Sequence, residues 1–299
     1  INRRFGRRIL QTESGDFYPS GVFYCKDAFE GLETMDTLIS KEKRPALLAK
    51  TVRESEMELG RASQTVERST LNVQRSSTVP APIAPPAKWG IRVVKEMPLE
   101  MVFKHLSINE LYRLSWGAKN THGDEWTKLK AEFDARLDKM KREALRDRWL
   151  KPQAVYGYFP CQSDGDDLII YNPTTIADSR ESLTRFHFPR QNFDDHLCLA
   201  DYFAPVDSGK LDVVAFQVVT VGREATERID RLHAAGDYTD SYFLHGLGVQ
   251  TAEATADYLH NHIRRELGLG DEQGKRYSWG YPAIPELEDH RKVFDLLPV

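Results

Sequence analysis

A stretch rich in Ser, Thr and Pro, from about residue 63 to residue 87, is the feature that most constrains how this chain can fold. Its end, Val79-Pro80-Ala81-Pro82-Ile83-Ala84-Pro85-Pro86, favours extended polyproline geometry because proline cannot continue a helix. So long a structureless segment is unusual inside a compact domain, and 299 residues is long for one hydrophobic core. We therefore expect two parts, residues 1–62 and 88–299, joined by a linker at residues 63–87.

The first part has the pattern of a partial Rossmann-like α/β fragment. Residues 21–25 are apolar and predict a buried strand, and Asp27 with Glu30 three residues later is a capping pattern that opens a helix. Pro45 suits the first position of a second helix. Ligands of open α/β sheets bind at the carboxyl ends of strands, where residues 26–28 would lie. Because nothing precedes the strand to pair with it, we expect that upstream sequence has been removed.

The second part has the pattern of an α+β domain. Helical spacing predicts short helices near residues 99–106 and 109–115 and a long helix over 126–144, and two more helices close the pattern, the second from about 239 to 267. Between them lie four predicted strands, at residues 154–159, 168–171, 185–188 and 213–221. The first two form a hairpin, and the last is apolar enough to be central in its sheet. Strands grouped between helices, rather than alternating with them, indicate an antiparallel sheet flanked by helices.

Composition excludes several classes of partner. Lys and Arg number 41 against 45 Asp and Glu, which gives no electrostatic reason to expect nucleic acid or an anionic membrane. No apolar run approaches the ~20 residues that a membrane helix needs. Three well-separated cysteines favour a reducing cytoplasm over a disulfide framework. His260 and His262 lie two positions apart on a predicted helix and so point to different faces, which argues against a metal site.

One irregular segment, residues 274–285, has the composition of a ligand-binding loop. Gly and Pro punctuate it, and three aromatic residues and Arg276 lie within it. Aromatic rings can stack on adenine or attract a cationic sulfur, and an arginine can hold a carboxylate through two parallel hydrogen bonds. Alternatively, Arg276 pairs on the surface with Asp271 or Glu272, and composition weighs the two equally. Glu253, in the preceding helix, is either a partner for a ligand ammonium or a solvated helix residue.

Short motifs along nearly the whole chain resemble the cobalamin-dependent methionine synthases, in the same order. They are Tyr24-Cys25-Lys26-Asp27-Ala28, Lys88-Trp89-Gly90, Leu111-Tyr112-Arg113-Leu114-Ser115-Trp116-Gly117, Phe159-Pro160, Gly165-Asp166-Asp167, Phe186-His187-Phe188-Pro189-Arg190-Gln191, Leu197-Cys198-Leu199-Ala200-Asp201-Tyr202 and the RxxxGYPA element from Arg276 to Ala283. Residues 1–62 resemble the end of that family's cobalamin-binding domain. Residues 88–299 resemble its S-adenosylmethionine-binding activation domain.

This resemblance implies a function. In the family, cobalamin passes a methyl group from methyltetrahydrofolate to homocysteine, and oxidation to cob(II)alamin stops the cycle. The activation domain restores methylcobalamin with an electron from flavodoxin or a similar reductase and a methyl group from S-adenosylmethionine. The chain is thus expected to be a cytoplasmic methyltransferase fragment whose partners are that reductase and its own cobalamin, folate and homocysteine modules. The alternative is a non-catalytic docking module for flavodoxin and the cobalamin domain.

The resemblance also implies the site residues. The S-adenosylmethionine site is expected to contain Glu110, Glu253, Arg276, Ser278 and Tyr281, with Arg276 on the methionine carboxylate. Ala28 is expected to pack against cobalamin, and no residue is assigned to catalysis. The D-x-H-x-x-G motif that supplies the lower axial histidine is absent, as are the zinc-bearing module and the family's aromatic tail. We therefore expect zinc only in the full-length enzyme, cobalamin held mainly by the missing upstream part, and a weakened S-adenosylmethionine site.

Overall fold

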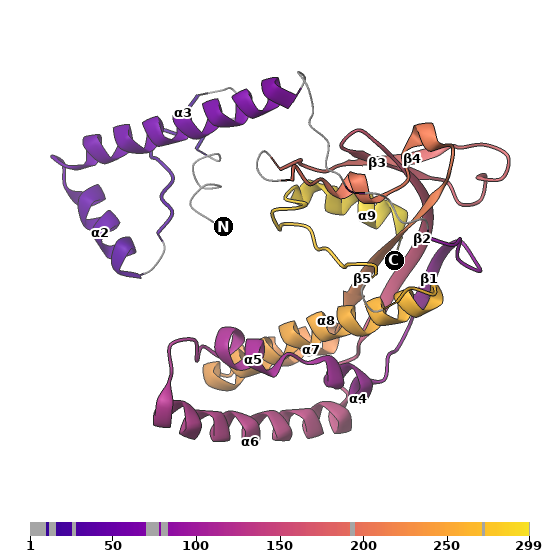
Figure 1. The fold of residues 1–299 in the computed structure, drawn as a ribbon. Helices are drawn as coiled ribbons and strands as arrows, with labels where there is room; N and C mark the ends of the chain where they lie inside the picture. Colours follow the sequence, from indigo (N-terminus) through magenta and orange to yellow (C-terminus); the bar gives the residue numbers. More distant parts are fainter. Residues whose placement is uncertain are drawn as a thin grey trace. The chain divides into compact units, whose positions relative to one another are not determined.

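The computed structural model divides the chain into two compact units, residues 1–74 and 75–299, which are described separately (Figure 1). The residues that it describes are 10–11, 16–25, 28–69, 78, 83–191, 195–270 and 273–298; of these, 28–29 and 58–69 are described by their backbone alone. Residues 70–77 and 79–82 of the expected linker lie outside these ranges.

The first unit contains two packed helices, α2 (Ala28–Ile39) and α3 (Arg44–Ser69). Both begin close to where the sequence predicts, with Pro45 as the second residue of α3, and α3 continues into the segment expected as linker. The predicted strand at residues 21–25 is wrong, because that segment is half-buried coil with no described strand beside it to complete a hydrogen-bonded ladder. The Rossmann-like assignment of this unit is therefore not confirmed.

The second unit is built on a five-stranded antiparallel sheet. Its strands are β1 (Gly90–Val94), β2 (Gln153–Asp164), β3 (Asp167–Tyr171), β4 (Ser182–His187) and β5 (Asp212–Thr220). One edge of β2 pairs with β5, and its other edge pairs first with β1 and then with β3, which continues to β4. The α+β class and the β2–β3 hairpin are thus confirmed, whereas β1 was not predicted.

The prediction that β5 is central is wrong. Among the described strands it pairs only with β2, so it forms an edge of the sheet. Its apolar sequence has a different cause, since both of its faces are covered. Val213 packs in one hydrophobic core and Phe216 in the other.

Helices cover both faces of the sheet. The larger core contains α6 (Gly123–Asp147), α7 (Arg223–Ala234) and α8 (Tyr238–Glu266), and Figure 1 shows these three helices gathered on one side. Shorter elements pack with them, namely α4 (Leu99–Val102), η1 (Phe103–His105), α5 (Ile108–Glu110) and the π-helix η2 (Leu111–Ser115). The smaller core lies on the other face, under η3 (Leu199–Tyr202) and α9 (His290–Leu296); the remaining short helices are η4 (Val206–Ser208) and η5 (Leu287–Asp289).

Strand alternation explains the two cores. Tyr156 and Tyr158 of β2 point into the larger core, whereas Val155, Phe159 and Cys161 point into the smaller one, as the two-residue period of a strand requires.

Across the described residues, none of the helices combines the length and the apolar character needed to span a bilayer.

Candidate functional site

The loop that follows α8, residues 273–285, has a defined shape. Gly274 and Gly280 adopt positive φ angles of 71° and 91°, which favour glycine. The Gly280 N–H donates to the Ile284 carbonyl at 2.9 Å, and the Ile284 N–H donates to the Tyr281 carbonyl at 3.0 Å. Ile284 is buried in the smaller core, whereas Tyr281 remains 64% exposed. The turn therefore fixes the loop to the sheet and presents Tyr281 to solvent.

Trp279 of this loop belongs to the core rather than to a ligand surface. Its ring packs against Phe186 and Phe216, with centroid separations of 5.6 and 6.2 Å. Tyr277 and Tyr281 are the aromatic residues of the loop that stay exposed. Partial burial raises the pKa of Tyr277, so its hydroxyl stays protonated at neutral pH. The two tyrosines, not the tryptophan, are available for stacking.

Four polar residues of α8 share one face of the helix, because they recur at a spacing of three or four. This polar stripe of α8 consists of Glu253, Asp257, His260 and Arg264. His260 Nε2 lies 3.0 Å from the Gly274 carbonyl, and burial lowers the pKa of this histidine. Arg264 donates to the carbonyls of Gln273, at 2.7 Å, and of Gly270. The C-terminal half of the stripe, His260 and Arg264, thus holds the start of the loop against the helix.

The N-terminal half of the stripe, Glu253 and Asp257, holds Arg276. The Arg276 Nη2 lies 2.8 Å from Asp257 Oδ1 and 3.4 Å from Glu253 Oε2. Its Nη1 lies 3.5 Å from Ser278 Oγ. The arginine side chain is 24% exposed, whereas the carboxylates of Glu253 and Asp257 are about half exposed, at 55% and 49%. The structure therefore brings together three residues that the sequence analysis assigned to one site.

Sequence reasoning missed Asp257, although a signal for it existed. It lies four positions after Glu253, on the same helix face, and it is the nearest acidic partner of Arg276 in the described residues. The alternative pairing of Arg276 with Asp271 or Glu272 falls on residues outside the described ranges.

The other predicted site residues are placed less closely. Tyr281 lies in the same loop as Arg276 and is exposed. Glu110 is the last residue of α5 and is exposed, and no described contact joins it to Arg276 or Glu253. Ala28 is the first residue of α2 in the other unit, and its side chain is outside the described part.

The π-helix η2 links α5 to α8. Gln250 Nε2 donates to Ser115 Oγ at 3.1 Å, and Gln250 Oε1 is buried without a partner among the described atoms. π-Helical turns occur often at functional sites. This contact joins the last residue of η2 to α8.

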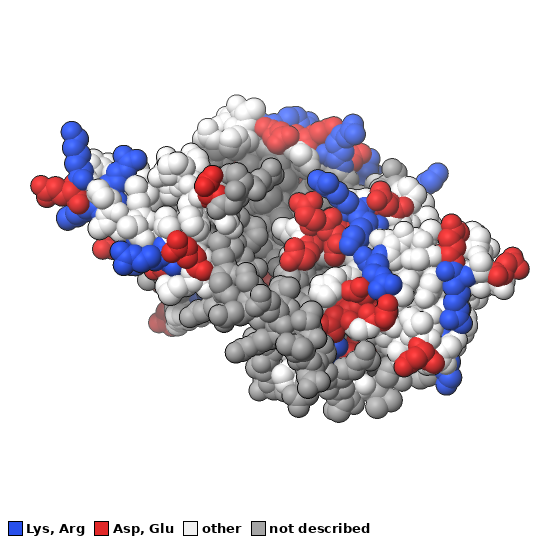
Figure 2. Space-filling view, turned by 90° about the horizontal axis from the view of Figure 1, so that it is seen from above, with Lys and Arg blue, Asp and Glu red and all other residues white. Residues whose placement is uncertain are grey.

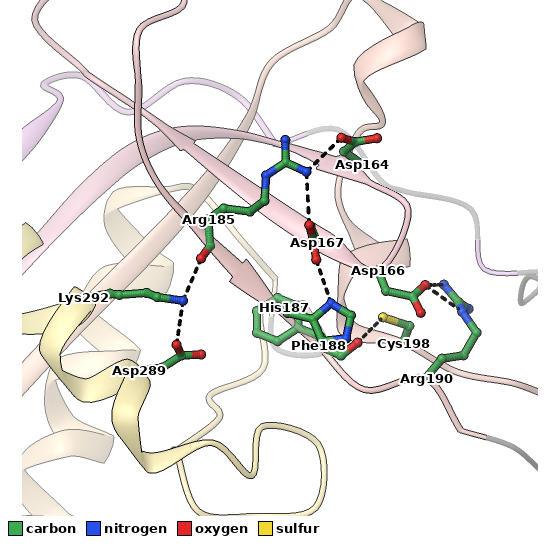
Figure 3. Close-up of polar contacts among 10 residues, drawn as sticks. All are labelled: Asp164, Asp166, Asp167, Arg185, His187, Phe188, Arg190, Cys198, Asp289 and Lys292. Atoms are coloured by element: carbon green, nitrogen blue, oxygen red, sulfur yellow. Dashed lines mark hydrogen bonds and ion pairs between the residues drawn. The ribbon is translucent and has the colours of Figure 1, made fainter. Parts of the chain in front are cut away.

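Away from the loop, three of the sequence motifs meet in a buried ion cluster, part of which Figure 3 shows. Arg190 forms a two-pronged pair with Asp201, at 2.5 and 2.7 Å, and contacts Asp166 at 2.8 Å. The side chains of Arg190 and Asp201 are only 9% and 11% exposed, and the hydrogen bonds that Arg190 donates to Asp201 and Asp166 raise the pKa of Arg190 above its ordinary value. Cys198 beside them is buried, which raises the pKa of its thiol to about 11. The cluster joins the β2–β3 turn to η3.

Figure 2 shows no separation of charges by sign among the described residues of one face. On the face that Figure 2 shows, acidic and basic side chains lie next to one another. Within the described ranges, no group of three or more His, Cys, Asp or Glu residues is arranged to hold a metal ion.

The sheet, the helices on both of its faces and the loop held on α8 define the second unit as an α+β domain. The family model described as "Vitamin B12 dependent methionine synthase, activation domain" matches residues 92–299, and the chain belongs to this family.

Individual relatives agree with this family. The chain is 30% identical to methionine synthase of Mycobacterium tuberculosis over 339 residues and 30% identical to that of Mycobacterium leprae over 344 residues. Each alignment covers 97% of this chain but only 28% of the relative's length. A crystal structure of the MetH reactivation domain bound to AdoHcy is similar with a TM-score of 0.63 and 25% identity, over 73% of this chain and 72% of that one.

Proposed function

We propose that this chain is the reactivation part of a cobalamin-dependent methionine synthase and binds S-adenosylmethionine for the reductive methylation of cob(II)alamin. The observation that carries the proposal is the cluster of Arg276, Glu253 and Ser278 between α8 and its loop. The relative crystallised with AdoHcy, the demethylated form of that ligand, supports it. Because the chain spans 28% of the curated relatives, methyl transfer from methyltetrahydrofolate to homocysteine is proposed for the longer enzyme.

The chemistry of the cluster fits the methionine end of the ligand. That end carries a carboxylate, an ammonium and a positive sulfur. Arg276 offers hydrogen-bond donors and a fixed positive charge for the carboxylate, and Glu253 offers a half-exposed carboxylate for the ammonium. Tyr277 and Tyr281 place two exposed rings on the same loop for the sulfur or the adenine. By resemblance, Glu110 and the backbone near Ser278 and Tyr281 complete the site.

In this proposal cobalamin is the methyl acceptor. When bound, it would supply a reducible cobalt. This chain's proposed contribution is Ala28, with the main contacts coming from the upstream part of the longer enzyme. The proposed protein partners are flavodoxin or a similar reductase, which supplies the electron, and the enzyme's own cobalamin, folate and homocysteine modules. Zinc is proposed only for the full-length enzyme.

Calorimetric titration with S-adenosylmethionine tests the proposal. We expect saturable binding by the chain and its loss in Arg276→Ala. Arg136→Ala is a matched control, since Arg136 is also a partly exposed arginine paired with an aspartate of α8, Asp240, at 2.6 Å. The control should bind as the unmodified chain does. Equal binding by Arg276→Ala would show that the assigned loop is wrong and would favour a docking module instead.

A further inference from the structure

We infer that Asp257 is a built-in competitor of the ligand carboxylate for Arg276, so that its charge limits the affinity of the site for carboxylate-bearing ligands. The inference rests on the proposed function, because it concerns the same arginine. The starting observation is that Arg276 is already paired, with Asp257 0.6 Å nearer to its Nη2 than Glu253 is, at 2.8 against 3.4 Å.

The geometry of a guanidinium makes this pairing a competition. An arginine can hold a carboxylate by two forks, one formed by Nε and Nη2 and the other by Nη1 and Nη2. Both forks use Nη2, which is the nitrogen that Asp257 and Glu253 contact. Nη1 is engaged only weakly, by Ser278 Oγ at 3.5 Å. Nη2 has two N–H groups, one in each fork, and two carboxylates already contact it, so a ligand carboxylate in either fork competes with Asp257 or Glu253 for this nitrogen and lies next to the charge of Asp257.

The charge of Asp257 is not needed to shape the loop. His260 and Arg264 hold its first residues through backbone carbonyls. Its far end is fixed by the turn between Gly280 and Ile284 and by the packing of Trp279 in the core. Replacing Asp257 by Asn keeps an acceptor oxygen for Arg276 and removes only the negative charge. The variant should therefore fold as the unmodified chain does.

The test compares two probes that differ in one group. They are AdoHcy and its decarboxylated analogue, which keeps the adenosine and the ammonium. In Asp257→Asn, we expect AdoHcy to bind about two- to fivefold more tightly, the size of effect that a half-exposed ion pair produces. Binding of the decarboxylated analogue should be unchanged or weaker, so the ratio of the two affinities rises.

Asp240→Asn is the matched control for charge. Asp240 lies on the same helix, pairs with an arginine at 2.6 Å and is 49% exposed, as Asp257 is. The rise of an α-helix places it about 25 Å from Asp257. This variant changes the net charge equally and should leave both affinities unchanged.

The outcomes separate the inference from the proposed function. If the unmodified chain binds AdoHcy and Asp257→Asn binds it equally or more weakly, the inference is overturned while the proposed function stands; weaker binding would show that Asp257 instead positions Arg276. A rise in AdoHcy affinity in Asp240→Asn as large as that in Asp257→Asn would also overturn the inference, since net charge alone would explain it. If the unmodified chain binds neither probe, the proposed function fails and the inference with it.

Discussion

Arg190 shows at the scale of a single residue how a buried charge is made stable. Taking a guanidinium out of water costs free energy, which here is offset by the pairs with Asp201 and Asp166. The three residues come from separate sequence motifs. They therefore hold distant parts of the chain in one geometry, and removal of one carboxylate leaves donors of the buried guanidinium without their acceptors.

We predict that Asp201→Asn lowers the free energy of unfolding by about 2 kcal/mol, because the amide can accept only one of the two hydrogen bonds that Arg190 donates to the carboxylate, which leaves a buried donor unsatisfied. Urea denaturation at pH 7 measures this change. Asp164→Asn is the control, since its pair with Arg185 is half exposed and should contribute less than about 1 kcal/mol. Equal effects of the two substitutions would contradict the assigned role of the cluster.

Residue pairs were the least predictable feature. Glu132 and Arg136 lie four positions apart on α6, a spacing that favours an ion pair, but the structure pairs Arg136 with Asp240 of α8. Likewise, Arg276 pairs with Asp257, nineteen positions away. A sequence shows which charges are neighbours on one helix, whereas pairs between elements depend on packing that local patterns do not encode.

At the scale of elements, one carboxylate fixes the end of α8 to the sheet. Glu266 accepts hydrogen bonds from the hydroxyls of Tyr158, at 2.7 Å, and Tyr156, at 3.1 Å. Both tyrosines are buried in the larger core, and burial with this contact raises the pKa of Tyr156 to about 12. Burial alone would raise the pKa of Glu266, but the two hydroxyl donors together with His262 and Arg92 outweigh it and the pKa is lowered.

This lowered pKa gives a pH-dependent prediction. Because Glu266 ionises more easily in the folded state than at its ordinary pKa of 4.5, its contribution to stability is present above about pH 4.5 and is lost as the pH falls through the folded-state value. We expect Glu266→Gln to lower the free energy of unfolding by about 1 kcal/mol at pH 7. Denaturation at a series of pH values should show this difference shrinking below pH 4.5. A difference that grows as the pH falls would contradict the prediction.

Elements with a strong local period were predicted well, and those that depend on distant partners were not. The stripe of α6 and the β2–β3 hairpin follow from short-range pattern. Strand β1 has only five residues, and its partner β2 begins more than fifty positions later. The apolar run of β5 indicated burial correctly, but the order of strands in a sheet is set by long-range pairing.

At the scale of the whole molecule, the boundary between the two compact units falls after residue 74 of the sequence, inside the segment expected as a linker. We predict that limited proteolysis cuts first between residues 63 and 87, where Ser, Thr and Pro prevail. Since α3 is helical to Ser69, the sites should fall after it. Mass spectrometry of the first fragments gives the positions. Early cuts within β5 would contradict the proposed domain boundary.

The candidate site could be predicted only in part, because local sequence patterns do not encode contacts between distant elements. Arg276, Glu253 and Ser278 came from a loop composition and a family resemblance, and the structure brings them together. The packing of Trp279 in the core and the hydrogen bonds of His260 and Arg264 to the loop depend on how α8 lies against the sheet. No motif encodes that arrangement.

Strand β2 has a consequence for the newly synthesised chain. Its 12 residues are almost all buried in the finished unit, and its longest partner, β5, as well as the helix α8, lie more C-terminal. While the ribosome is still making residues 212–266, an apolar strand with an open edge is exposed to other chains. Unit 2 therefore cannot complete its core until its last third has emerged, and a pause before β5 would be the step most exposed to aggregation.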